Sequence, residues 1–208
     1  MAEYLRINPK SPNPRDIEHV ANCLLHGGVI IYPTDTVYGL GCDVTKTRAV
    51  ERVAALKGMK LKDAQLAIVV NDLSRLADYA RVETPIFKLM KKTLPGPFTF
   101  ILNATGEVPK IFQNKKKTIG IRIPNNIIPL EIVRMLGHPI TTTSVVDEDA
   151  ILEYTTDPAM IYENFKDKVD IVIDGGFGNN IPSTIVDCTS GDYEVIRQGL
   201  GYLEEFGF

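Results

Sequence analysis

The chain has 208 residues, of which 44% are hydrophobic and 24% are charged, and this composition is typical of a soluble globular protein with a core of its own. Its formal net charge of −3 argues against a protein whose main role is to coat nucleic acid, because such proteins are usually basic. Its three cysteines form no C-x-x-C pair, so we expect no zinc site. The sequence contains neither a signal-peptide pattern nor an apolar run of membrane length. We therefore expect a cytoplasmic protein with no membrane contact.

The pattern of apolar residues predicts helices and strands that are interleaved along the chain. The first helix begins at Pro14 and ends before Gly27 and Gly28, with its apolar residues at helical spacing. A buried strand over residues 29–33 follows it. Further helices are predicted for residues 45–58, 72–80, 84–96, 127–137 and 157–168. Further strands are predicted for residues 65–70, 97–105, 117–124, 139–146, 169–176, 183–189 and 193–199.

Two adjacent pairs of strands interrupt the alternation of helix and strand. The last pair is joined by a predicted turn at residues 190–192. No repeat or long linker divides the chain, so we expect a single domain over residues 1–208. The fold class predicted from this order is α/β, with a twisted, open mixed sheet and flanking helices.

Polar side chains follow or interrupt several of the predicted strands. The strand over residues 29–33 opens onto hydroxyls, a carboxylate, a phenol and glycines: Thr34, Asp35, Thr36, Tyr38, Gly39 and Gly41. Arg122 and Arg197 lie inside otherwise apolar strands, where an arginine is costly unless a partner neutralises it. Hydroxyl clusters occur at residues 141–144 and 183–184. Together these features predict an anion-lined crevice for a small molecule at the edge of the sheet.

Each of these features alone also fits a structural role. Threonines are common in strands, a lone strand arginine usually faces solvent, and Asp35 more often caps a turn than takes part in catalysis. Lys115, Lys116 and Lys117 fit a solvated turn. The prediction of a small-molecule site therefore depends on the features occurring together.

Seven segments of the sequence resemble the YrdC-like family. In order they are GGVIIYPTDTVYGLGCDV, RVAALKG, LPGPFTFIL, TIGIRIP, PITTTS, PSTIVD and VIRQG, from about Gly27 to about Gly199. One such segment would be weak, but seven in register are specific. The resemblance implies a twisted α/β sheet with a concave surface. It also implies synthesis of threonylcarbamoyl-adenylate from L-threonine, bicarbonate and ATP, with release of pyrophosphate, for modification of the adenosine beside the anticodon of certain tRNAs.

The resemblance also implies how individual residues bind L-threonine. The residues that match threonine-binding positions of the family are Thr36, Arg122, Thr142 and Ser183. Arg122 is placed to pair with the carboxylate of the amino acid. Gly39 and Gly41 are expected to let the backbone turn tightly beside this pocket.

A second set of residues matches the nucleotide side of the family site. These residues are Lys57, Lys60, Thr118, Ser144 and Arg197. ATP is expected as a substrate, with magnesium but without a metal held by the protein. A carbamate oxygen would attack the α-phosphate, so no side chain needs to be a covalent nucleophile. The catalytic roles of Lys57 and Arg122 in this nucleotidyltransferase reaction would be positioning and charge stabilisation.

The sequence departs from the synthase pattern at two places. Active synthases typically carry K-x-R beginning at the position of Lys57, whereas the third residue here is Met59, with Lys60 and Lys62 after it. They also carry S-x-N, whereas Ser144 is followed here by two valines, so that Val146 stands where the asparagine would be. Methionine and valine cannot make the hydrogen bonds of an arginine fork or an amide. These departures resemble the YciO branch, and we expect weak synthase turnover.

An RNA-binding accessory protein without synthase turnover is the alternative prediction, because some members of the family have been described as binding double-stranded RNA. Such a protein would bind RNA or tRNA through the lysines at 57, 60, 62 and 115–117, although the acidic net charge counts against it. A deep pocket lined by Thr36, Arg122 and Ser183 would favour small-molecule chemistry. A shallow basic stripe would favour RNA.

Overall fold

The computed structural model describes residues 1–58, 66–106, 117–145 and 156–208. Within these ranges the strands are β1 (Glu3–Arg6), β2 (Val29–Tyr32), β3 (Gly39–Cys42), β4 (Ala67–Val69), β5 (Ala80–Arg81), β6 (Phe98–Ala104), β7 (Thr118–Arg122), β8 (Ile140–Ser144), β9 (Ile171–Asp174), β10 (Thr184–Asp187) and β11 (Glu194–Arg197). The helices are α1 (Pro14–Leu25), α2 (Thr47–Leu56), α3 (Leu76–Tyr79), α4 (Thr84–Thr93), α5 (Ile127–Leu136) and α6 (Pro158–Phe165), with a 3-10 helix η4 (Leu203–Phe206). In this part of the chain, no helix is long and apolar enough to span a membrane.

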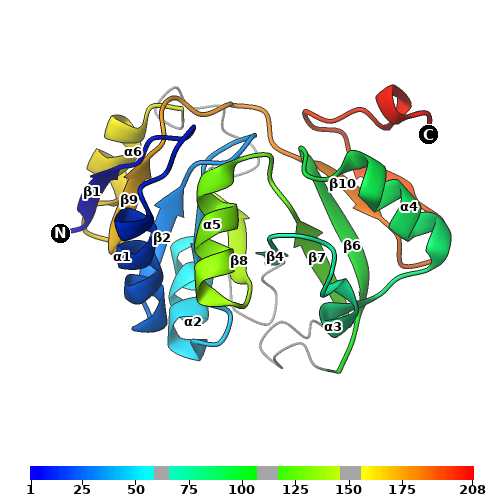
Figure 1. Ribbon diagram of the computed structural model, residues 1–208, viewed down its shortest axis with the longest axis horizontal. Helices are drawn as coiled ribbons and strands as arrows, with labels where there is room; N and C mark the ends of the chain where they lie inside the picture. The colour runs from blue at the N-terminus through cyan, green and yellow to red at the C-terminus, as the bar shows by residue number, and fades with distance from the viewer. Residues whose placement is uncertain (59–65, 107–116, 146–155) are drawn as a thin grey trace.

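The strands form one mixed sheet, as the sequence predicts (Figure 1). Their order is β1-β9-β2-β3-β8-β4-β7-β6-β10-β11, and β5 pairs with β6 beside this path. Parallel pairs join β1 to β9, β9 to β2, β4 to β7 and β6 to β10, and the other neighbours are antiparallel. The predicted hairpin between the last two strands is confirmed, because β10 and β11 pair antiparallel across the turn.

The twist of the sheet brings the carboxyl ends of β2 and β7 together, although the intervening pairs make these strands formally antiparallel. Neighbouring strands rotate by roughly 20–25° at each step, and four steps separate β2 from β7. In Figure 1 the chain leaves both strands toward the upper side of the view. A direct hydrogen bond of 3.1 Å joins Arg122, the last residue of β7, to Thr34, just after β2.

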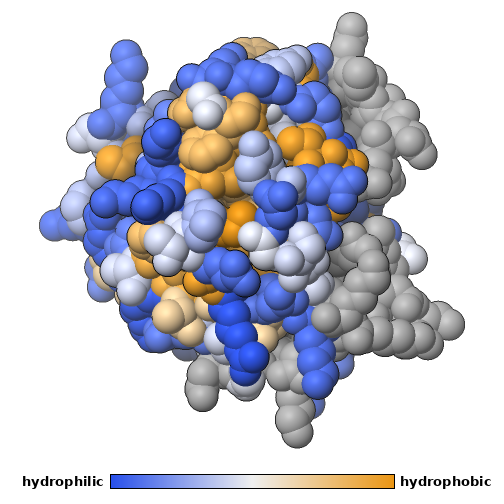
Figure 2. Space-filling model, turned by 90° about the vertical axis from the view of Figure 1, so that its right-hand side faces the viewer, coloured by the Kyte–Doolittle hydropathy of each residue, from blue (hydrophilic) through white to orange (hydrophobic). Residues whose placement is uncertain are grey.

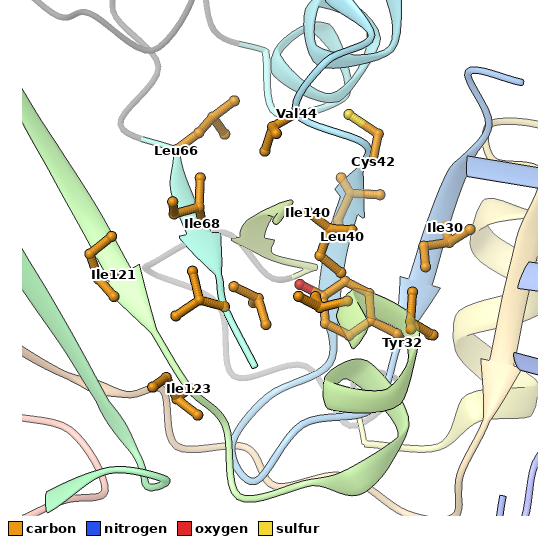
Figure 3. Close-up of a cluster of buried hydrophobic side chains, with 14 of the residues drawn as sticks. Ile30, Tyr32, Leu40, Cys42, Val44, Leu66, Ile68, Ile121, Ile123 and Ile140 are labelled. Atoms are coloured by element: carbon orange, nitrogen blue, oxygen red, sulfur yellow. The ribbon is translucent and has the colours of Figure 1, made fainter. Parts of the chain in front are cut away.

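The core lies against the middle of the sheet, where both faces are covered. Figure 3 shows Ile30, Leu40, Ile68, Ile121 and Ile140, which come from five neighbouring strands and are at most 2% exposed. Helix α1 packs against α5 and β2, and α2 packs against β2 and β3. Cys42 and Cys188 are buried, and Cys23 is half-buried.

The outer half of the sheet has one covered face and one open face. Along β6 the side chains of Phe98, Phe100 and Leu102 are buried, whereas Thr99 and Ile101 between them are only half-buried. Phe98 packs on Phe206 of η4, with ring centroids 5.9 Å apart. We call the other side, which carries Thr99 and Ile101, the open face.

Two parts of the secondary structure differ from the sequence prediction. The segment from Gly39 to Cys42 was predicted as an irregular polar stretch, but it forms the buried strand β3 between β2 and β8. The helix predicted over residues 72–80 is reduced to the single turn α3, because the chain enters strand β5 at Ala80. The structure also adds the edge strand β1, for which no prediction was made.

Candidate active site

Arg122 is the centre of a buried cluster formed with the segment that follows β2. Its Nη2 donates hydrogen bonds to Thr34 Oγ1 at 3.1 Å and to Asp35 Oδ1 at 2.9 Å. The same nitrogen also contacts Thr36 Oγ1. The hydroxyl of Thr34 donates to the backbone oxygen of Val37 at 2.8 Å and accepts from the backbone N–H of Thr36 at 3.0 Å, which fixes the turn. The structure therefore brings together Thr36 and Arg122, two of the residues predicted to bind L-threonine.

Asp35 supplies the charge that balances Arg122. The side chains of Arg122 and Asp35 are only 8% and 11% exposed, and they form a salt bridge of 2.9 Å. Among the described residues, Arg122 Nε and Asp35 Oδ2 have no hydrogen-bond partner although both are buried. Buried polar atoms in folded proteins almost always have a partner. Arg122 Nε can therefore still donate a hydrogen bond to a ligand, and Asp35 Oδ2 can still accept one.

The register of the sheet places four of the predicted residues on one face. Ala67 of β4 lies opposite both Thr142 of β8 and Gly120 of β7, and residues directly opposite in a sheet share a face. Because side chains alternate along a strand, the residues two positions away from these also lie on this face. The predicted residues on this face are Thr118, Arg122, Thr142 and Ser144.

The same face continues to the outer strands. Thr99 of β6 lies opposite Ile185 of β10, and Ile185 lies opposite Arg197 of β11. The hydroxyls of Thr99 and Ser183 are 2.9 Å apart, and Arg197 Nη2 donates to the backbone oxygen of Ser183 at 2.9 Å. Arg122 and Arg197 therefore lie on the same face of the sheet. In the outer half of the sheet, this face is the open face. That the two arginines share a cavity remains a prediction.

Tyr32, the last residue of β2, is fully buried, and β3 passes close to its ring. A Cβ atom on Gly39 would lie 2.8 Å from the Tyr32 ring, and one on Gly41 would lie 2.1 Å from the backbone oxygen of Thr141. Neither glycine has a positive φ. The expectation that Gly39 and Gly41 permit a tight turn is therefore wrong: Gly39 permits close packing of the strand against Tyr32, and Gly41 permits close packing against the backbone of Thr141.

Burial raises the pKa of the Tyr32 phenol to about 12, from an ordinary value near 10.0, while Thr142 and Arg122 act to lower it. Between about pH 10 and 12, the phenol is neutral in the folded protein, whereas the same phenol in the unfolded chain is already ionised. Its contribution to stability is complete below pH 10 and is lost as the pH rises toward 12.

Raising the pH from about 10 to about 12 is therefore expected to lower the free energy of unfolding. Urea titrations across this range, with wild type and Tyr32→Phe, measure the effect. The decline should be less steep in the variant, because other buried groups such as Cys42, whose pKa burial raises to about 12, are common to both proteins. Equal slopes would show that Tyr32 does not ionise differently in the two states.

The remaining predicted residues are less fully placed. Lys57 caps the carboxyl end of α2 and is half-buried. Lys60, Met59, Lys62, Val146, Lys115 and Lys116 lie outside the described residues. Two described cavities, of about 780 and 190 Å³, are lined by other residues. The predicted pocket lined by Thr36, Arg122 and Ser183 thus stays a prediction.

The described residues contain no group of three or more histidine, cysteine, aspartate and glutamate side chains that could hold a metal ion.

Sequence reasoning missed three members of the site. Asp35 was weighed as a turn cap, Tyr32 was taken as a core residue of a buried strand, and Thr99 received no role. A signal for Asp35 was present, because a buried arginine requires a buried anion and Asp35 is the acidic residue of the polar segment after β2. No comparable signal pointed to Thr99.

Comparison with known proteins shows the family to which the chain belongs. A family model for Sua5, YciO and YrdC proteins, described as telomere recombination, matches residues 22–199. The chain is 37% identical to the uncharacterized protein YciO of Escherichia coli K12, over 99% of this chain and 100% of YciO. The crystal structure of E. coli YciO has a TM-score of 0.91 at 35% identity, over 99% of this chain and 100% of that one.

A structure of P. abyssi Sua5 complexed with L-threonine also matches, with a TM-score of 0.85 and 26% identity over 99% of this chain and 59% of that one. The chain belongs to the Sua5/YciO/YrdC family. Its similarity to YciO over the full length of both chains places it in the YciO-like branch.

Proposed function

We propose that the protein binds L-threonine and an adenine nucleotide on the face of the sheet that carries Arg122, and that it makes threonylcarbamoyl-adenylate slowly. The observation that carries this proposal is the buried arginine of β7 held among the hydroxyls and carboxylate that follow β2. A buried guanidinium with an unused donor is suited to a carboxylate ligand. The relative P. abyssi Sua5, which is complexed with L-threonine, supports the choice of amino acid.

In the proposed reaction the threonine ammonium first releases a proton to solvent, and the neutral amine then combines with bicarbonate to give a carbamate and water. A carbamate oxygen then attacks the α-phosphorus of ATP, the bond to the β-phosphate oxygen breaks, and pyrophosphate leaves. Arg122 would hold the carboxylate, while Thr36, Thr142 and Ser183 would orient the amino acid. Catalysis would come from positioning and charge stabilisation rather than from a covalent intermediate.

The nucleotide would lie beside the amino acid, toward β10 and β11. The residues proposed to bind it are Lys57, Lys60, Thr118, Ser144 and Arg197, of which Lys60 lies outside the described residues. Mg²⁺ bound to the phosphates would neutralise charge as pyrophosphate leaves. The product would serve the threonylcarbamoyl modification of tRNA.

Binding of ATP, measured by calorimetry, tests the nucleotide half of the proposal. Arg197→Ala is expected to weaken ATP binding by about tenfold to a hundredfold, because a hydrogen bond to a charged group contributes about 1.5–3 kcal/mol. Arg15→Ala is the matched control, since Arg15 is exposed on α1. Absence of ATP binding to the wild type, together with binding of double-stranded RNA, would instead favour the RNA-binding accessory protein.

A further inference from the structure

We propose that Asp35 makes the site selective for zwitterionic α-amino acids, by acting as the acceptor for the ammonium group while Arg122 binds the carboxylate. The inference rests on the proposed function, since it assigns a specificity role at the amino-acid site. It starts from the charge balance of the buried cluster rather than from the motif that defines the family.

The first step concerns net charge. Arg122 and Asp35 are 8% and 11% exposed and joined at 2.9 Å, so the pair is neutral in a largely dry environment. Among the hydrogen-bond partners of Arg122 in the described residues, Asp35 is the charged one. A neutral pair can take up a zwitterion without leaving net charge in the site. A ligand with a carboxylate but no amine would leave a buried negative charge, which is costly.

The second step concerns hydrogen-bonding capacity. Two of the buried side-chain atoms without hydrogen-bond partners in the described residues belong to this pair: Arg122 Nε, a donor, and Asp35 Oδ2, an acceptor. A carboxylate supplies acceptors and an ammonium supplies donors, and an α-amino acid carries both on neighbouring carbon atoms. The unused donor and the unused acceptor of the pair therefore match the carboxylate and the ammonium of a zwitterion.

The third step concerns the geometry of the pair. Asp35 is held in the turn after β2, where Thr34 bonds to Val37 O at 2.8 Å and to Thr36 N at 3.0 Å. The carboxylate is therefore positioned by the backbone rather than by Arg122 alone. Replacing it with an amide should preserve the turn while removing one negative charge.

Calorimetry with three ligands tests the proposal. The ligands are L-threonine, 2,3-dihydroxybutanoate, in which a hydroxyl replaces the amine, and 1-aminopropan-2-ol, which lacks the carboxylate. The wild type is expected to bind L-threonine at least about tenfold more tightly than either analogue. In Asp35→Asn the site gains a net positive charge, so L-threonine should bind about tenfold to a hundredfold more weakly and the preference over the hydroxy acid should vanish or reverse.

Two variants control for structural damage. Asp35→Glu keeps the charge and should keep the preference for the amino acid. Asp170→Asn removes the acidic partner of Arg52, a pair joined at 2.6 Å outside the site, and should leave the preference unchanged. Urea unfolding of each variant shows whether a loss of binding comes with a loss of folding. The ratio of the affinities for L-threonine and 2,3-dihydroxybutanoate is measured only on folded protein.

The outcomes separate this inference from the proposed function. If the wild type binds L-threonine and Asp35→Asn keeps the same preference, the role of Asp35 is overturned and the proposed function stands. If the wild type binds serine, alanine or glycine instead of threonine, and Asp35→Asn removes that preference, the inference stands and the choice of threonine fails. If no amino acid binds, both are overturned.

Discussion

Arg122→Ala is expected to lower the free energy of unfolding by about 3–5 kcal/mol and to abolish measurable binding of L-threonine. The substitution leaves Asp35 buried without its cation, and breaking a buried pair from one side costs about this much. It also removes the guanidinium that would hold the carboxylate. Urea unfolding and calorimetry measure the two effects separately.

The matched variant removes both charges. Arg122→Met combined with Asp35→Asn should recover much of the lost stability, because no unpaired charge remains, but it should not recover binding. If Arg122→Ala is as stable as the wild type, the pair is not buried in solution as the structure describes it. If that variant also binds L-threonine normally, the carboxylate lies elsewhere.

The double replacement Met59→Arg with Val146→Asn is expected to raise the rate of adenylate formation by about a hundredfold or more. Both positions lie outside the described residues, so this expectation comes from the K-x-R and S-x-N patterns of active synthases. Removing one donor to a transition state costs on the order of a hundredfold, and restoring donors should return a similar factor. Pyrophosphate release under saturating ATP and L-threonine gives the rates.

Isosteric controls distinguish the hydrogen bonds from added charge or bulk. Met59→Lys with Val146→Leu should leave the rate near that of the wild type, because neither side chain supplies the fork or the amide. A wild type that already matches a synthase with intact motifs would show that the departures are tolerated. An unchanged slow rate in the restored variant would point to a different substrate.

The covered strands and long helices could be predicted because their patterns are local. The run from Val29 to Tyr32 is fully buried, and helix α1 carries its apolar residues on one face. Strand β3 could not be predicted, since its two glycines weaken strand propensity, and they are required there by the ring of Tyr32 beside Gly39 and the backbone oxygen of Thr141 beside Gly41. Strand β1 was missed because it is short and mostly exposed, and it depends on parallel pairing with β9.

The site shows the same division between local pattern and tertiary arrangement. Arg122 could be singled out because an arginine in an apolar strand requires a partner. The sequence offers Asp35 as an acidic residue after a buried strand, but no local pattern shows that it pairs with Arg122, because β2 and β7 are four strands apart and only the twist of the sheet brings their ends together. The shared face of Thr118, Thr142 and Ser144 depends on the register with Ala67, which no local pattern encodes.

The most direct test of the central claim is detection of threonylcarbamoyl-adenylate by mass spectrometry after incubation of the wild type with ATP, bicarbonate and L-threonine. The proposed function predicts that adenylate and pyrophosphate form in equal amounts, slowly, and that each depends on all three substrates. It also predicts that Arg122→Met with Asp35→Asn forms neither product while remaining folded. If a folded wild type forms no adenylate above this double variant after prolonged incubation, the protein is not a synthase for this product.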